Sequence, residues 1–245
     1  MRRFERIRVV WLVALGFFLC AGAVLVSAQN SAGIPDEELT PYQTALLNYK
    51  TGHYDAALTA IDIAEQAKPG DLATEILKAR ILTELKDYAG GEKLLRSLLA
   101  PANGPLEVQV ALGDLLLRKG DFNRASKFYD LALQGKPNDP DLTLKMIYAR
   151  IGANDLLTAG KLASQLKPLD PDHPSYYFAQ AALAHVTGKA GDADEDIQTA
   201  RTLYGITVSN RYLKTYLELF AQPVNNPSDA VPPPATNAAP VEAKP

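Results

Sequence analysis

Histidine is the side chain best able to bind a metal or to exchange protons near neutral pH, and the 245-residue chain contains three. His53 lies in a predicted turn, His173 lies in the loop LDPDHPS, and His185 lies near the end of a predicted helix. A metal site needs several ligands that converge on one point. Because these three residues lie in different segments, we expect no shared metal.

Three alternating aspartates, Asp192, Asp194 and Asp196, reproduce the opening of a calcium-binding loop. Such a loop also needs glycine at its sixth place and glutamate at its twelfth, where this chain has Ile197 and Leu203. We therefore interpret the acidic run as a helix N-terminus, where the helix dipole favours negative charge.

Motifs for phosphate and nucleophilic chemistry are incomplete. The pairs Gly160-Lys161 and Gly188-Lys189 lack the earlier glycine and the following Ser or Thr of a phosphate-binding loop. No G-x-S-x-G sequence occurs, and the single cysteine, Cys20, lies in an apolar N-terminal run. We predict that the protein is not an enzyme and that it uses no cofactor, disulfide or metal.

The charge balance argues against nucleic acid as a partner. The chain has 25 Lys and Arg against 28 Asp and Glu, a formal net charge of −3. Its lysines are scattered and form no basic stripe of the kind that a phosphate backbone requires.

Both ends of the chain differ from its middle. Residues 1–8 carry four arginines and precede the uncharged apolar run 9–26, which predicts a secretory signal peptide ending at Ala28. The run is also long enough for a retained membrane anchor. In either case we expect the rest of the chain to be exported, to the periplasm or the cell exterior, with residues 29–37 as a linker. The Pro- and Ala-rich residues 223–245 predict a disordered tail.

Between these ends the sequence repeats with a period of 34 residues. One column contains only very small side chains: Ala57, Gly91, Ala125, Ala159 and Ala193. A second column contains Gly52, Lys86, Gly120, Asn154 and Gly188. A third contains Pro69, Asn103, Pro137, Pro171 and Gly205.

Each column has a physical reason. The second column ends a first helix, where Gly and Asn best tolerate left-handed backbone. Asp87, Asp121 and Asp155 follow it directly, with Asp55 and Asp192 close by, and predict caps for the next helix. The small column allows two helices to cross closely. The third column stops the second helix. The pattern therefore predicts antiparallel helix pairs.

Small residues at the eighth and twentieth places of each unit, an aromatic residue at the seventeenth (Tyr54, Tyr88, Phe122) and proline near the end resemble the tetratricopeptide repeat. The resemblance covers about 170 residues and weakens in the fourth and fifth units, at Ile147 and Ala190. It implies an all-α fold: a right-handed solenoid of about five helical hairpins over residues 38–222. Residues Tyr212, Leu213, Tyr216, Leu217 and Phe220 predict a C-terminal capping helix that covers the last repeat.

The resemblance also implies a binding groove lined by the first helix of every unit. Its fifth places are Tyr42, Ile76, Val110, Leu144 and Phe178. Its ninth places include Leu46, Arg80, Asp114 and Tyr148, and its twelfth places include Tyr49 and His185. A carboxylate clamp would need Lys and Asn where the first unit has Tyr42 and Leu46. An alternative is that some of these side chains pack between neighbouring helices.

We therefore expect a scaffold of the cell envelope that binds a peptide or helix in an apolar and aromatic groove. Two alternatives remain open: a structural module that assembles with further copies of itself, and an accessory subunit that tethers an envelope enzyme. The sequence identifies neither the partner nor the oligomeric state.

Overall fold

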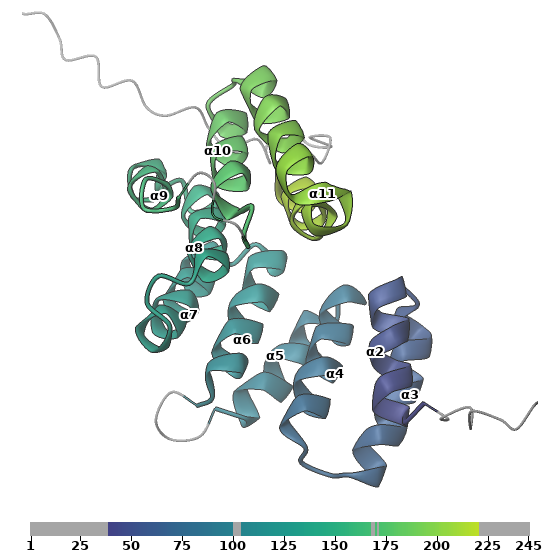
Figure 1. The fold of residues 1–245 in the computed structure, drawn as a ribbon. Coiled ribbons are helices and arrows are strands. Elements are labelled where there is room, and N and C mark those ends of the chain that lie inside the picture. The colour runs from purple at the N-terminus through teal and green to yellow at the C-terminus, as the bar shows by residue number, and fades with distance from the viewer. Residues whose placement is uncertain (1–38, 100–103, 168–169, 171, 221–245) are drawn as a thin grey trace, which may run out of the picture. The chain divides into compact units, whose positions relative to one another are not determined.

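The computed structural model describes residues 39–99, 104–167, 170 and 172–220. The predicted export segment, linker and tail lie outside the described residues. The described residues form ten helices and no strands (Figure 1). The helices are α2 (Pro41–Thr51), α3 (Tyr54–Ala67), α4 (Leu72–Glu84), α5 (Tyr88–Ser97), α6 (Leu106–Lys119), α7 (Phe122–Gly135), α8 (Pro140–Gly152), α9 (Leu156–Ala163), α10 (Ser175–Val186) and α11 (Ala190–Phe220).

Within the unit Pro41–Pro245, the described helices pair in chain order. Helix α2 packs on α3, α4 on α5, α6 on α7, α8 on α9, and α10 on α11. The first helices of the pairs also pack on one another, from α2 through α4, α6 and α8 to α10. The five predicted hairpins are therefore confirmed, and their first helices form one continuous layer.

The turn between the two helices of each hairpin has the backbone that the sequence predicts. All five residues of the Gly, Lys and Asn column have positive φ, from 59° at Asn154 to 84° at Gly120. L-residues adopt this left-handed conformation at a cost, which glycine avoids. Lys86, with φ 63°, bears that cost in the second unit.

The column of very small side chains belongs to the second helix of each hairpin. All five of its members are buried. At Gly91, an added Cβ would lie 2.9 Å from Cδ1 of Leu115 and 3.2 Å from the carbonyl oxygen of Ala79. Any larger side chain there would push the helices apart.

Aspartates cap three of the five second helices, α5, α7 and α9, as predicted. Helix α3 begins after His53 without a side-chain cap, and Asp55 lies in its first turn. The side chain of Asp87 accepts a hydrogen bond from the backbone N–H of Gly90 at 2.9 Å, and Asp155 accepts one from Thr158 at 3.2 Å. Asp121 caps α7 in the same way. These bonds satisfy donors that the first turn of a helix leaves free.

Two apolar clusters hold the described helices together. A small cluster joins α2, α3 and α4 around Ala45, Ile61 and Ile81. A larger cluster continues from α4 to α11 around Leu112, Tyr129 and other fully buried side chains. In the part of the chain that the structure describes, no helix combines the length and apolar character needed to span a membrane.

Helix α11 contains one residue with non-helical backbone. Gly205 has φ 79° and ψ 160° and divides α11 into residues 190–204 and 206–220. Gly205 belongs to the column predicted to stop the second helix, so the fifth unit ends where the sequence predicts. Residues 206–220, called the docked helix below, then take a new direction.

Candidate functional site

The first helices α2, α4, α6, α8 and α10 carry all the side chains predicted to line a groove, and we call their shared surface the inner face. Four of these side chains are buried: Ile76, Leu144, Tyr148 and Phe178. Arg80 is exposed. The remaining six are half-buried: Tyr42, Leu46, Tyr49, Val110, Asp114 and His185.

The N-terminal part of the inner face is apolar and aromatic, and it is only partly covered. Tyr42, Leu46 and Tyr49 lie against the small apolar cluster of α2, α3 and α4. The rings of Tyr49 and Tyr54 are 6.0 Å apart. Burial, and then the nearby Glu84 carboxylate, raises the pKa of Tyr49, so its hydroxyl is neutral at physiological pH.

The middle of the inner face is held by polar contacts within the chain. Asp114 accepts hydrogen bonds from the Tyr129 hydroxyl and from Nζ of Lys145, both at 2.8 Å. Tyr129 lies on α7 and Lys145 lies on α8, so Asp114 of α6 links three helices. The carboxylate predicted to face a groove is thus engaged by its own chain.

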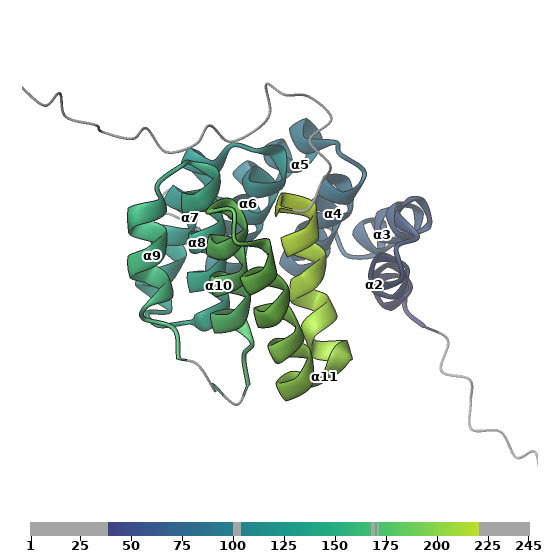
Figure 2. The same cartoon turned by 90° about the horizontal axis from the view of Figure 1, so that it is seen from above.

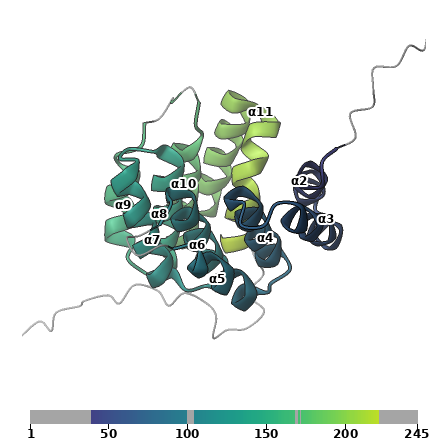
Figure 3. The same cartoon turned by 90° about the horizontal axis from the view of Figure 1, so that it is seen from below.

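The C-terminal part of the inner face is covered by the docked helix. The ring of Tyr212 stacks on that of Phe178 at 5.5 Å and 22°, and its hydroxyl donates to Asp141 at 2.7 Å. The ring of Tyr216 meets Phe178 edge-on at 6.4 Å. In Figures 2 and 3, the yellow end of α11 lies between α10 and α4. Burial and the bond to Asp141 raise the pKa of Tyr212.

The end of the docked helix continues this aromatic contact. The ring of Phe220 lies 5.2 Å from that of Tyr148 in an edge arrangement and 6.4 Å from His185. The hydroxyl of Tyr216 lies 3.4 Å from Nδ1 of His185. Such aromatic pairs contribute about 0.5–1.5 kcal/mol each beyond the area they bury.

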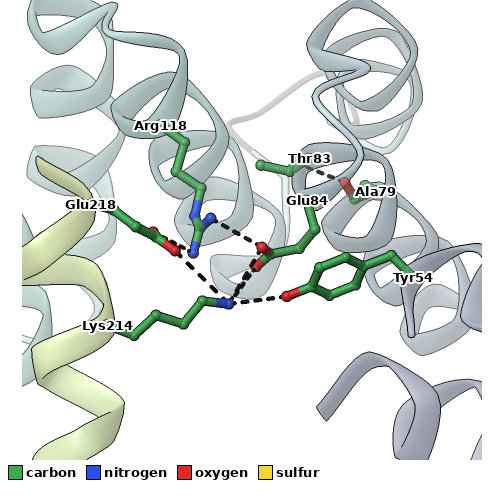
Figure 4. A network of polar contacts seen from close by, with 7 residues as sticks. All are labelled: Tyr54, Ala79, Thr83, Glu84, Arg118, Lys214 and Glu218. Atoms are coloured by element: carbon green, nitrogen blue, oxygen red, sulfur yellow. Dashed lines mark hydrogen bonds and ion pairs between the residues drawn. The ribbon is translucent and has the colours of Figure 1, made fainter. Parts of the chain in front are cut away.

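Ion pairs fix the exposed flank of the docked helix (Figure 4). Nζ of Lys214 lies 3.4 Å from the Glu84 carboxylate and 3.2 Å from the Tyr54 hydroxyl. Glu218 pairs with Arg118 at 3.0 Å, and Arg118 pairs with Glu84 at 3.2 Å. Burial lowers the pKa of Arg118, but Glu84 and Glu218 outweigh it, so the net shift is upward. The docked helix therefore contacts side chains of all five hairpins.

The predicted capping helix thus covers more than the last repeat. The sequence shows the helical spacing of its aromatic residues, but nothing in that spacing indicates that they lie on the inner face of α8 and α10. Glu84 and Arg118 were also missed, because they occupy the thirteenth place of their units. The sequence does contain a signal for this pair, because Glu84 and Arg118 carry opposite charges and lie 34 residues apart, one repeat period.

A cavity of about 210 Å³ lies between α8 and the docked helix. Its lining includes Leu144, Lys145, Tyr148, Tyr212 and Thr215. The hydroxyl of Tyr148 is buried and has no hydrogen-bond partner among the described residues. Burial raises the pKa of this hydroxyl well above its usual range.

No protein-family model matches the chain. Solved structures do match. A tetratricopeptide-repeat protein of Thermus thermophilus aligns with a TM-score of 0.59 and 22% identity, over 72% of this chain and 97% of the other. A tetratricopeptide-repeat protein of Parabacteroides merdae aligns with a TM-score of 0.58 and 14% identity, over 72% of this chain and 70% of the other. The chain has the tetratricopeptide-repeat fold.

A third structure with a similar fold is MamA of Desulfovibrio magneticus RS-1, with a TM-score of 0.51, 16% identity, and coverage of 65% of this chain and 90% of the other. Among curated proteins, the human protein O-mannosyl-transferase TMTC1 is 24% identical over 149 residues, or 58% of this chain. This chain spans only 17% of the length of that relative.

The tetratricopeptide-repeat fold keeps the candidate metal ligands apart. His53 lies before α3, Nδ1 of His173 lies 3.4 Å from the Asp141 carboxylate, and His185 contacts the docked helix. Among the described residues, no group of three His, Cys, Asp or Glu side chains is placed to hold a metal ion. Asp192 lies in the first turn of α11, consistent with the helix-start interpretation.

Proposed function

We propose that the protein is a non-enzymatic scaffold of the cell envelope, exported by its N-terminal segment, and that its inner face binds a helix of a partner protein. One observation supports this most strongly: the inner face already holds an amphipathic helix of its own chain, through the rings of Tyr212, Tyr216 and Phe220. A surface that accepts one helix of this kind has the shape and chemistry for another.

The N-terminal part of the inner face is the region we propose for the first contact with a partner. It adjoins the surface that the docked helix occupies, because Lys214 contacts Tyr54 and the Tyr54 ring lies 6.0 Å from that of Tyr49. Tyr42 and Leu46 stay half-exposed there, and Arg80 is exposed. Tyrosine and arginine are enriched among residues that dominate binding energy at protein interfaces. The solved structures that share the fold support a protein-binding role in general terms.

The experiment compares two double variants of the full chain in its native envelope. Tyr42→Ala with Arg80→Glu changes the inner face, whereas Leu47→Ala with Lys50→Glu changes exposed positions elsewhere on α2. After crosslinking, captured proteins are quantified by mass spectrometry. We expect the inner-face variant to lose proteins that the wild type and the control retain, with helicity unchanged by circular dichroism. Equal capture by both variants would contradict the proposal.

A further inference from the structure

The docked helix carries a pattern that matches the inner face in detail. Its aromatic residues Tyr212, Tyr216 and Phe220 recur every four positions and so lie on one side of the helix. Lys214 and Glu218 are also four apart and reach the ion pairs on the flank. The aromatic row contacts α8 and α10, while the charged pair contacts α3, α4 and α6.

This helix nevertheless fits the inner face incompletely. Ile206 is 64% exposed and Leu217 is 44% exposed, so part of the apolar surface of this helix stays uncovered. A solvent-open cleft of about 210 Å³ lies between this helix and α8. Tyr148 is 2% exposed, and its hydroxyl has no hydrogen-bond partner among the described residues. Buried hydroxyls are normally hydrogen-bonded. A different helix could satisfy this site better.

The bend that places this helix on the inner face lies at a single residue. Gly205, with φ 79° and ψ 160°, has a backbone conformation that is strained for any residue with a Cβ. The bend is also held by the buried Ser209 hydroxyl, which donates to the Ala200 carbonyl at 3.1 Å. If Gly205 took helical backbone, α11 would be continuous and residues 206–220 would leave the inner face.

We propose that the docked helix is a built-in, releasable occupant of the inner face, and that the partner protein displaces it with an amphipathic helix of the same pattern. That partner helix carries aromatic residues at every fourth position, a Lys and Glu pair on one flank, and a hydrogen-bond acceptor for Tyr148. This inference rests on the proposed function and specifies the partner.

The test uses the full chain and a fluorescein-labelled peptide of residues 206–220, ITVSNRYLKTYLELF. Gly205→Ala destabilises the bend, whereas Gly191→Ala is a matched control in α11 with ordinary backbone and open space around its Cβ. By fluorescence anisotropy, we expect Gly205→Ala to bind the peptide about ten-fold more tightly than the wild type or the control, because the strained conformation disfavours its own helix. A peptide with Ala at both tyrosines should not bind.

A second variant keeps the hinge intact. Lys214→Glu with Glu218→Lys places like charges against Glu84 and Arg118 and should also raise peptide affinity. If neither variant binds the peptide more tightly than the control, the helix is not a releasable occupant. If Gly205→Ala forms dimers that exclude the peptide, a second copy and not a partner protein is the occupant. Either result overturns the proposal, while capture through Tyr42 and Arg80 is an independent measurement.

Discussion

Two fully buried tyrosines provide a direct test of the described packing, because their hydroxyls have opposite surroundings. The Tyr129 hydroxyl donates to Asp114 at 2.8 Å, whereas the Tyr148 hydroxyl has no partner among the described residues. Replacing each by Phe removes one oxygen and keeps the ring. For Tyr129 the ring is held tightly, since a Cβ at Gly113 would lie 2.5 Å from it.

The expected free-energy changes differ in sign. A hydrogen bond to a charged group contributes about 1.5–3 kcal/mol to stability. Since Asp114 keeps its contact with Lys145, we expect Tyr129→Phe to destabilise the protein by about 1.5–2 kcal/mol. Tyr148→Phe removes a buried group that gains nothing in return, so we expect no loss and a gain of up to about 1 kcal/mol.

Urea unfolding monitored by circular dichroism at pH 7 measures both changes, with the slope of the transition as a check that the same surface is exposed. Neither hydroxyl ionises at that pH, because burial raises the pKa of both. A loss for Tyr148→Phe equal to that of Tyr129→Phe would refute the assigned contacts. It would mean that the Tyr148 hydroxyl has a hydrogen-bond partner.

Two further predictions concern single residues of the repeats. Lys86→Gly should raise the free energy of unfolding by about 0.5–1 kcal/mol, because glycine adopts φ 63° without the steric cost that lysine bears. Urea titration measures this change, and a loss of stability would contradict the left-handed turn. Burial, and then two neighbouring carboxylates, raise the pKa of Asp196 to about 6. Its charged form therefore destabilises the fold, and stability falls as pH rises from about 4 to 6. After discounting for solvent exposure, Asp196→Asn should add about 1 kcal/mol at pH 8 and nothing at pH 4 in thermal unfolding; an equal effect at both values would rule out titration as the cause.

The hairpins could be predicted from the sequence because each column answers a local requirement. Ala57 and Gly91 are small because a neighbouring helix leaves no room, and Gly120 is glycine because its φ is positive. Asp121 is acidic because three residues later a backbone N–H needs an acceptor. These constraints act over a few residues or one helix crossing and recur every 34 residues, so the small column and the left-handed turn occur five times and the aspartate cap three times.

The occupied inner face could not be predicted in the same way. Leu144, Tyr148 and Phe178 were correctly assigned to first helices, but their burial depends on a segment that follows the last repeat and occurs once. Its contacts join residues as far apart as Tyr54 and Lys214, and no repeated column reports them. Their formation depends on the backbone angles of Gly205, which the residue type permits without dictating.

If the docked helix can leave the inner face, the apparent affinity of a partner should depend on the salt concentration. If about 1% of molecules have the inner face open, the apparent Kd of a displacing partner is about 100-fold weaker than its intrinsic value. The ion pairs of Lys214 and Glu218 are partly exposed, and salt screens such pairs. Added salt should therefore increase the open fraction. A partner helix without a Lys and Glu pair should then bind more tightly at high salt. A partner helix with such a pair would itself lose ion pairs with Glu84 and Arg118 at high salt, so its affinity should change little. The salt dependence of binding thus reports whether the partner shares the charged flank of the docked helix.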